Sequence, residues 1–319
     1  MFTEENLRPL KYAAMRDRNA VLVVGSITQD YVEGPGGNLD GAIGGSATYF
    51  ALAAQHFVPV SVVGAVGRDR EAEIRQLLDF ADLSRLQAVD EPTYTWRSRR
   101  SSRDGEATTV ERFAGAFDGY VPELGAPGSV PTTAFLGSCD PEVQLAVARG
   151  CPPGAFIAGD SMDIFIEGQR PAVERMVRHC NILFATGHEL ELLTQTAGVE
   201  AAGRRLLEQF GLETLVVKLG ARGAVLLNHG DVRRLPTFPV DVADPTGAGD
   251  ALAGGFMGRL IELGDRGDDR LLLEALEWGI VAASFAISGL GVSALKTVSR
   301  ADLEGRLDAY RANRGAPPA

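Results

Sequence analysis

Short apolar runs alternate with helical patterns along most of the chain, and this alternation restricts the fold more than any other feature. The runs are rich in Val, Ile and Leu, and most are continuous rather than alternating with polar residues. They occupy 21–24, 60–63, 134–136, 155–158, 182–184, 214–217 and 224–227. Continuous runs are typical of strands buried on both faces. Such strands separated by helices predict a mostly parallel sheet between two helical layers, a three-layer α/β/α fold.

Two stretches interrupt the alternation. Residues 30–45 are glycine-rich with little helical potential, and 93–113 contains two strand patterns separated by a turn with Asp104-Gly105. Asp-Gly between two strands is a strong hairpin signal. We therefore expect one domain spanning 1–319, with a small β lid built from about 30–45 and 93–113. The predicted strands of the hairpin are 94–100 and 108–113.

The composition excludes several classes of protein. The 319 residues include 31 Lys and Arg against 42 Asp and Glu, a net charge of −11, whereas nucleic-acid-binding proteins usually present a basic face. No lysine follows a glycine, so the Gly-Lys-Ser/Thr signature of P-loop NTPases is absent. His-Arg-Asp and Asp-Phe-Gly, which protein kinases need, are absent too. We expect a small-molecule substrate and no nucleic-acid partner.

The sequence also predicts a cytoplasmic protein that does not associate with a membrane. Three cysteines without metal-ligand spacing indicate neither a disulfide framework nor a zinc site, which fits a reducing compartment. Residues 1–20 are polar and lack the apolar core of a signal peptide. The longest uncharged run, 278–295, is rich in Gly, Ala and Ser, so we expect a buried helix that leads into a glycine loop.

The strongest functional signal is the string Asp-Pro-Thr-Gly-Ala-Gly-Asp-Ala-Leu-Ala-Gly-Gly-Phe at 244–256, between a strand-like segment and an apolar helix pattern at 251–263. A glycine turn at a helix start presents free backbone N–H groups at the positive end of the helix dipole, where anions bind. Asp250 would repel an anion there, so its presence is costly unless it does chemistry or holds a metal. The alternative is a capped helix, whose N-terminus favours Asp for dipole reasons alone.

Phosphoryl transfer to an alcohol accounts for both the turn and the carboxylate. Asp250 would accept the proton of the substrate hydroxyl, and the amides of Ala248, Gly249 and Asp250 would stabilise charge on the γ-phosphate. Mg²⁺ would bridge the nucleotide phosphates.

The string at 244–256 resembles the C-terminal signature of the PfkB/ribokinase family of carbohydrate and nucleoside kinases. Residues 44–54 resemble that family's Gly-Gly segment and following helix, 64–69 its next strand and turn, and 216–223 its nucleotide-side loop. The matches follow the family order over about 20–295. The resemblance implies a ribokinase-like fold and an ATP- and Mg²⁺-dependent kinase that phosphorylates a hydroxyl of a small sugar, polyol or nucleoside.

The resemblance also assigns roles around the reacting groups. It implies that Asp250 is the catalytic base and that Gly247, Ala248 and Gly249 form the anion hole. It places a substrate-binding carboxylate at Asp30, which suits a diol because a carboxylate accepts two hydrogen bonds. The alternative for Asp30 is a solvated loop acid.

Three more residues are implied on the substrate side. Gly44 and Gly45 would let the backbone approach the substrate, and their alternative is a plain turn. Tyr49 stands where the family often has an Asn that contacts the sugar. Since Tyr cannot replace a side-chain amide, we expect an altered substrate pocket.

On the nucleotide side, Thr186 and Glu189 match the family's Asn-x-x-Glu motif, which orders metal-bound water, with Thr in place of Asn. The alternative for this pair is a capping box. Asp244 fits one ligand position for a monovalent cation such as K⁺. Nucleotide contacts are implied for Lys218, Gly220, Gly223, Ser284 and Gly289, and the alternative for Lys218 is a solvated loop residue.

The lid hairpin is rich in arginine, at Arg97, Arg99, Arg100, Arg103 and Arg112. These side chains form either a clamp for an anionic substrate or a solvated face, and we favour the solvated face. Tyr94 and Trp96 fit either stacking on a sugar or base, or a contact between two lids. A homodimer through the lid is therefore an expectation by analogy.

Two other functions stay open. The departures at Tyr49 and Thr186 allow a non-catalytic sugar- or nucleoside-binding regulatory protein on the same fold. The turn 25–30 after the first strand lacks the Gly-x-Gly-x-x-Gly fingerprint, which argues against a dinucleotide-dependent oxidoreductase. The identity of the substrate does not follow from the sequence.

Overall fold

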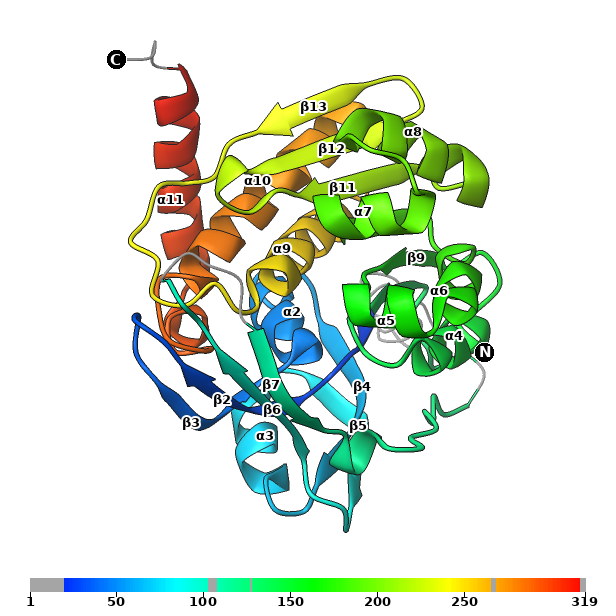
Figure 1. The fold of residues 1–319 in the computed structure, drawn as a ribbon, viewed down its shortest axis with the longest axis vertical. Helices are drawn as coiled ribbons and strands as arrows, with labels where there is room; N and C mark the ends of the chain where they lie inside the picture. Colours follow the sequence, from blue (N-terminus) through cyan, green and yellow to red (C-terminus); the bar gives the residue numbers. More distant parts are fainter. Residues whose placement is uncertain (1–19, 103–107, 127, 265–267, 316–319) are drawn as a thin grey trace, which may run out of the picture.

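The computed structural model describes residues 20–102, 108–126, 128–264 and 268–315. A nine-stranded sheet lies at its centre (Figure 1). Strands β5, β4, β1, β8, β9, β10 and β11 are neighbours in this order and run parallel, and β12 and β13 pair antiparallel at the β11 edge. In spatial order they are β13 (Val232–Leu235), β12 (Ala224–Asn228), β11 (Thr214–Lys218), β10 (Ile182–Thr186), β9 (Phe156–Gly159), β8 (Thr133–Leu136), β1 (Val21–Val24), β4 (Val60–Gly67) and β5 (Asp82–Val89). The predicted mostly parallel sheet is confirmed.

Helices cover both faces of this sheet (Figure 1). The α-helices are α2 (Ser46–Ala54), α3 (Glu71–Leu77), α4 (Pro141–Gly150), α5 (Asp163–Gly168), α6 (Arg170–Val177), α7 (Gly187–Thr194), α8 (Val199–Phe210), α9 (Ala248–Leu263), α10 (Asp269–Ala286) and α11 (Arg300–Gly315). Short 3₁₀ turns lie at η2 (Gly115–Phe117), η3 (Gly220–Arg222) and η4 (Leu295–Thr297). The three-layer α/β/α prediction is therefore confirmed.

Strand β1 demonstrates why the apolar runs are continuous. Val21 and Val23 enter one hydrophobic core, while Leu22 and Val24 enter the other, and all four are fully buried. The first core contains α2, α9 and α10, and the second contains α4, α6, α7 and α8. A strand that feeds two cores must be apolar at every position.

The lid sheet is a separate four-stranded sheet in the order β3-β2-β6-β7, and it lies in the lower half of Figure 1. Its strands are β2 (Thr28–Glu33), β3 (Leu39–Gly44), β6 (Tyr94–Arg99) and β7 (Thr108–Phe113). The predicted hairpin is confirmed as the antiparallel pair β6–β7. The turn expected at 101–105 extends beyond the described residues. A homodimer through this sheet stays a prediction.

The order of the strands reverses beside β1. The chain goes from β1 to β4 and β5 on one side, and later to β8, β9, β10 and β11 on the other. Open α/β sheets bind ligands at the carboxyl ends of strands where the order reverses in this way. The lid sheet begins at this point, because β2 follows β1 directly and the Ser26 N–H donates to Ser138 O.

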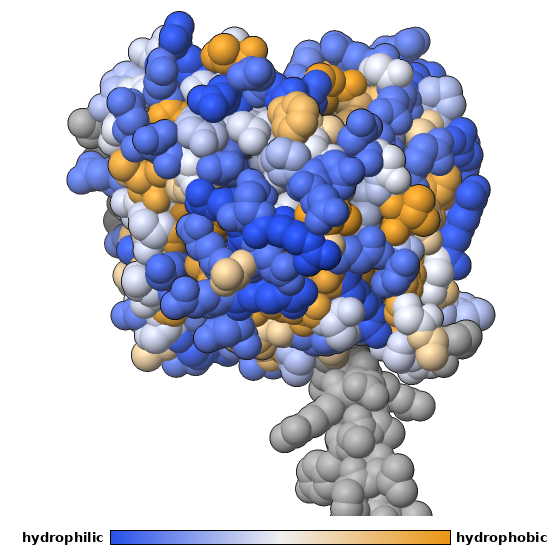
Figure 2. Space-filling model, turned by 90° about the horizontal axis from the view of Figure 1, so that it is seen from below, coloured by the Kyte–Doolittle hydropathy of each residue, from blue (hydrophilic) through white to orange (hydrophobic). Residues whose placement is uncertain are grey.

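Among the described residues, no helix combines the length and the apolar character needed to cross a bilayer. On the face in Figure 2, hydrophobic side chains are scattered among hydrophilic ones rather than gathered in one area. The apolar run at 278–295 belongs to α10 and the turns after it, as predicted.

Candidate active site

Helix α9 begins in the glycine turn, residues 244–250. Only glycine fits at the first glycine position of this turn, Gly247. Gly247 is the N-cap residue with φ 73°, a left-handed conformation that favours glycine. A Cβ at this position would lie 2.3 Å from the ring of Tyr49, so no side chain fits. The helix starts at Ala248, three residues before the apolar pattern at 251 suggested.

The first turn of α9 has the polarity of an anion site. Ala248, Gly249 and Asp250 form this turn, which is the start of a helix of 16 residues. The Ala248 N–H donates to Pro245 O over a long 3.3 Å, whereas the first strong helical bond runs from the Ala251 N–H to Gly247 O at 2.9 Å. The N-terminal amides of the helix therefore lie where a phosphate would meet the positive end of the dipole.

Lys218 lies directly against this turn. Its Nζ donates to Asp160 Oδ2 at 2.5 Å, and a Cβ at Gly249 would lie 3.2 Å from the same Nζ. The Lys218 side chain is 16% exposed, so the alternative of a solvated loop residue is wrong. The ion pair between Lys218 and Asp160 brings together the carboxyl ends of β9 and β11 at the start of α9.

Asp160 is the residue that sequence reasoning missed. It follows β9 directly, is 3% exposed and accepts a hydrogen bond from the Ser161 N–H at 2.8 Å. An acid immediately after a buried strand at the ligand-binding edge of the sheet was the available signal. With Lys218, Glu189 and Asp250 it forms a group that we call the charge cluster.

The charge cluster sets the proton affinity of Asp250. Burial raises the pKa of its carboxyl to about 7, the charge of Asp160 raises it further, and Lys218 opposes both. Burial likewise raises the pKa of Glu189 to about 7, with Lys218 lowering it and Asp160 raising it. Asp250 is nevertheless half-buried rather than enclosed, so a substrate can reach it. A pKa near 7 suits a general base at neutral pH.

Thr186 and Glu189 form a capping box at the start of α7. The Glu189 N–H donates to Thr186 Oγ1 at 3.1 Å, and the Thr186 N–H donates to Glu189 Oε2 at 2.6 Å. The alternative interpretation of this pair is confirmed as a structural fact. Glu189 Oε1 lies outside the two bonds, so an additional role near the phosphates stays a prediction.

Asp30 and the glycines beside it form one packed unit on the substrate side. Asp30 lies on β2, is 2% exposed, and accepts a hydrogen bond from Thr28 Oγ1 at 2.6 Å, so it is not a solvated loop acid. Burial raises the pKa of its carboxyl to about 7. A Cβ at Gly44 would lie 2.0 Å from Asp30 Oδ2, and Gly45 has φ 95°. Gly44 thus keeps room for this carboxylate, while Gly45 lies against the backbone of Ser26.

Tyr49 connects Asp30 with the glycine turn. Its side chain is 1% exposed, and its hydroxyl has no hydrogen-bond partner within the described residues. Burial raises the pKa of the phenol, and the charges of Asp30, Asp244 and Asp250 raise it further. The Tyr49 ring therefore lies against Gly247 of the glycine turn, and its phenol responds to the charges of both Asp30 and Asp250.

Asp244 is held by an arginine. Its carboxylate is 1% exposed, forms an ion pair with Arg100, and accepts hydrogen bonds from the Thr246 N–H at 2.9 Å and the Gly291 N–H at 3.3 Å. A role as ligand for a monovalent cation stays a prediction, and a cation there would share the carboxylate with a guanidinium.

The expectation of a solvated arginine face is wrong for Arg100, which is 8% exposed. It fits Arg97 and Arg99, which form exposed ion pairs with Glu111 and Glu33. Arg103 lies outside the described residues. The reason for the difference is that the Arg100 side chain, just after β6, leaves the lid sheet for Asp244 and Thr246, whereas Arg97 and Arg99 pair with acids of the lid sheet itself.

The four other predicted nucleotide-side residues differ in their surroundings. Gly220 has open space around it, while a Cβ at Gly223 would lie 1.9 Å from Leu235 O at the end of β13. Ser284 Oγ donates to Val281 O within α10 and accepts from Arg306 Nη1. Gly289 packs against Ser293 and Ala294. Their roles in nucleotide binding stay predictions.

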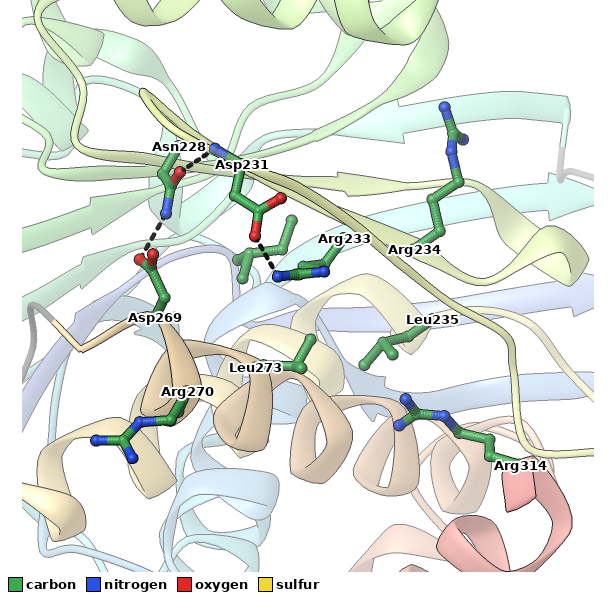
Figure 3. Close-up of a pocket in the computed structure, with 10 residues that line it drawn as sticks. Asn228, Asp231, Arg233, Arg234, Leu235, Asp269, Arg270, Leu273 and Arg314 are labelled. Atoms are coloured by element: carbon green, nitrogen blue, oxygen red, sulfur yellow. Dashed lines mark hydrogen bonds and ion pairs between the residues drawn. The ribbon is translucent and has the colours of Figure 1, made fainter.

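A pocket of about 280 Å³ lies elsewhere, between β12, β13, α10 and α11 (Figure 3). It is lined by Leu226, Asn228, Asp231, Arg233, Arg234, Leu235, Asp269, Arg270, Leu273 and Arg314. Each arginine is paired with an acid, namely Asp231, Glu200, Asp268 and Glu277. No predicted site residue lines this pocket, and its paired arginines offer an anion no free charge.

Comparisons with known proteins agree with this geometry. The sequence model described as pfkB family carbohydrate kinase matches residues 146–298. A nucleoside kinase of Methanothermobacter thermautotrophicus is 28% identical over 263 residues, covering 76% of this chain and 83% of the relative. A cytidine kinase of Thermococcus kodakarensis is 26% identical over 248 residues, covering 74% and 87%.

The fold is shared with solved structures. A fructokinase double mutant from Vibrio cholerae O395, solved with fructose, ADP and a potassium ion, superimposes with a TM-score of 0.75 at 20% identity. The match covers 91% of this chain and 98% of that one. The chain thus has the ribokinase-like α/β/α fold. Residues 146–298 match the pfkB family of carbohydrate kinases, and this match together with the two relatives makes the chain a phosphotransferase with an alcohol group as acceptor.

Proposed function

We propose that this chain transfers the γ-phosphate of ATP to a hydroxyl of a small sugar, polyol or nucleoside, with Asp250 as the general base. The supporting observation is the position of the Asp250 carboxyl in the first turn of α9. The residue is partly exposed, burial raises the pKa of its carboxyl to about 7, and the charges of Asp160, Lys218 and Glu189 act on that carboxyl. A positioned base of this kind contributes about 10²–10⁴-fold to the rate.

Different residues of the chain take the proton and stabilise the charge during transfer. Asp250 takes the proton of the attacking hydroxyl, and the amides of 247–250 stabilise the charge on the transferred group. Lys218 keeps its charge, because Asp160 and Glu189 raise its pKa against the effect of burial. That ammonium lies beside Gly249 and faces the same anion.

The residues present fit a nucleotide-bound magnesium ion. Among the described residues no group of three acids, histidines or cysteines is arranged to hold a metal. Mg²⁺ needs no such group, since it binds substrate phosphates, keeps several waters and takes one or two carboxylates. Glu189 would hold it through water, and Mg²⁺ would neutralise charge on the phosphates. K⁺ near Asp244 is part of the proposal, tested by replacing K⁺ with Na⁺.

Asp30 and Tyr49 would bind the acceptor. The carboxylate of Asp30 accepts hydrogen bonds from a diol, and the unpartnered Tyr49 hydroxyl can donate or accept one more. Sugars, polyols and nucleosides all present adjacent hydroxyls. Since relatives that cover most of this chain are named nucleoside kinase and cytidine kinase, nucleosides are the first acceptors to test.

An ADP-release screen tests the proposal. Purified protein with ATP and Mg²⁺ is mixed with pentoses, hexoses, sugar phosphates, inositols and nucleosides, each with a no-acceptor control. We expect acceptor-dependent ADP release with one class and a phosphorylated product by mass spectrometry, and neither with Asp250→Asn. Thermal stabilisation by an acceptor without ADP release across the whole panel would overturn the proposal in favour of a binding protein.

A further inference from the structure

Arg100 connects the lid sheet to the glycine turn. Its backbone N–H donates to Glu33 O at 2.8 Å, so its main chain belongs to the lid sheet. Its side chain leaves that sheet, with Nη1 donating to Asp244 Oδ1 and Nη2 donating to Thr246 Oγ1. The arginine and Asp244 are 144 positions apart in the sequence. One side chain therefore joins two regions that the chain forms separately.

The ion pair between Arg100 and Asp244 is buried, so losing either partner is costly. Arg100 is 8% exposed and Asp244 is 1% exposed. The loop between β2 and β3 packs onto the backbone next to Asp244, since a Cβ at Gly36 would lie 2.1 Å from Ala243 O. Removing one partner of a buried ion pair leaves an uncompensated charge, which is strongly destabilising. The lid sheet and the turn are thus held in one relative arrangement.

The guanidinium also borders the predicted reacting groups. Its charge and that of the Asp250 carboxyl both act on the Tyr49 phenol, whose ring lies against Gly247. Arg100 Nε is buried and has no hydrogen-bond partner within the described residues. A buried donor of this kind is rare unless a partner is still to arrive. The arginine is therefore placed to influence the turn and the acceptor side together.

We propose that Arg100 is a positioning residue for phosphoryl transfer. By holding Asp244 and Thr246 it fixes the glycine turn, and with it Asp250, when the lid sheet is docked over the acceptor. This inference rests on the proposed function. A displacement of about 1 Å at a reacting group can cost about 10²-fold in rate, so a looser turn is expected to slow transfer. A loosened lid would also admit water, which competes with the acceptor for the phosphoryl group.

The test compares Arg100→Met with Arg100→Lys and with a matched control, Arg99→Met. Arg99 is the preceding residue, and it forms an exposed pair with Glu33 inside the lid sheet. We expect kcat of Arg100→Met to fall about 10²-fold, with the KM for ATP little changed and a larger share of ADP released without acceptor. Arg100→Lys should recover part of kcat, and guanidinium ion should partly restore Arg100→Ala. Arg99→Met should match wild type.

A structural role alone would give another result. If Arg100→Met lowers only Tm while kcat of the folded protein is unchanged, the inference is overturned. Should that variant not fold, Arg100→Met/Asp244→Asn removes both charges, and a wild-type kcat in it overturns the inference as well. The outcomes separate the two proposals. Wild type without acceptor-dependent ADP release overturns the proposed function, whereas an active Arg100→Met beside an inactive Asp250→Asn overturns only this one.

Discussion

Each end of the glycine turn holds an aspartate, and the two aspartates differ in burial and in partners. Asp244, at the end facing the lid, is fully buried and is held by Arg100 and by two backbone N–H groups. Asp250, at the end facing the sheet, is half-buried, and burial and Asp160 raise its pKa to about 7. One aspartate fastens the turn, while the other keeps a proton that can leave near neutral pH. Position in the charge field separates their roles.

The charge balance around each end explains this difference. Asp244 meets one guanidinium, so the pair is neutral. The charge cluster has three carboxyl groups around the single ammonium of Lys218. Like charges in a buried site disfavour ionisation of all members, and protons are retained. Burial raises the pKa of Asp250 to about 7, and the excess of carboxylates over the single ammonium adds to that effect.

The largest expected effect is on the rate at the sheet-facing end. Asp250→Asn should lower kcat by about 10²–10⁴-fold, because the amide cannot accept the hydroxyl proton. Tm should stay level or rise, since the substitution removes a desolvated carboxyl. Steady-state ADP release, thermal melting and nucleotide titration check this. A variant that turns over at a similar rate would show that Asp250 is not the base.

The same substitution at the lid-facing end should act on stability as well as on the rate. Asp244→Asn leaves the buried Arg100 guanidinium without its counter-charge, at an expected cost of about 3–5 kcal/mol in the free energy of unfolding. The matched control is Glu33→Gln, which breaks the exposed pair with Arg99 and should cost about 0–1 kcal/mol. Chemical denaturation measures both. Equal losses in the two variants would contradict the contrast drawn between buried and exposed pairs.

Two glycines in the turn allow a finer comparison. Gly247→Ala forces a side chain into a left-handed conformation and against the Tyr49 ring, with an expected cost of about 1–3 kcal/mol. Gly249→Ala meets the flexible end of Lys218, with Cδ 3.1 Å away, and gains about 1 kcal/mol of helix propensity. Gly249→Ala should therefore melt near wild type, with a modest loss of kcat. A less stable Gly249→Ala than Gly247→Ala would reverse the interpretation.

The sequence predicted the sheet-facing end better than the lid-facing end. The glycine turn, Asp250 and the lid hairpin follow from short local patterns, because turn geometry and strand alternation are written in neighbouring residues. The partnership of Arg100 with Asp244 joins residues 144 positions apart, and hairpin spacing cannot reveal which of several arginines leaves the sheet. Asp160 was missed for the same reason, since its significance comes from Lys218 on another strand.

The pH dependence of kcat/KM and of stability tests the raised pKa of Asp250. Asp250 must be ionised to act, so kcat/KM should rise with pH and level off above about 7. Stability should change in the opposite sense. Asp30, Glu189 and Asp250 have raised pKa values, so the folded state binds protons more tightly, and the free energy of unfolding should fall as pH rises toward 7.

Lys218→Met removes the ammonium that lowers the pKa of Asp250, so the midpoint of the kcat/KM profile should move upward by about 1 unit. Lys296→Met, at an exposed lysine in η4, is the control and should leave the midpoint unchanged. Because the midpoint is separate from the plateau rate, the shift is measurable even if Lys218 also contacts the phosphate. An unchanged or lower midpoint would mean that Lys218 does not set the proton affinity of the base, and that the contrast between the two ends has another electrostatic origin.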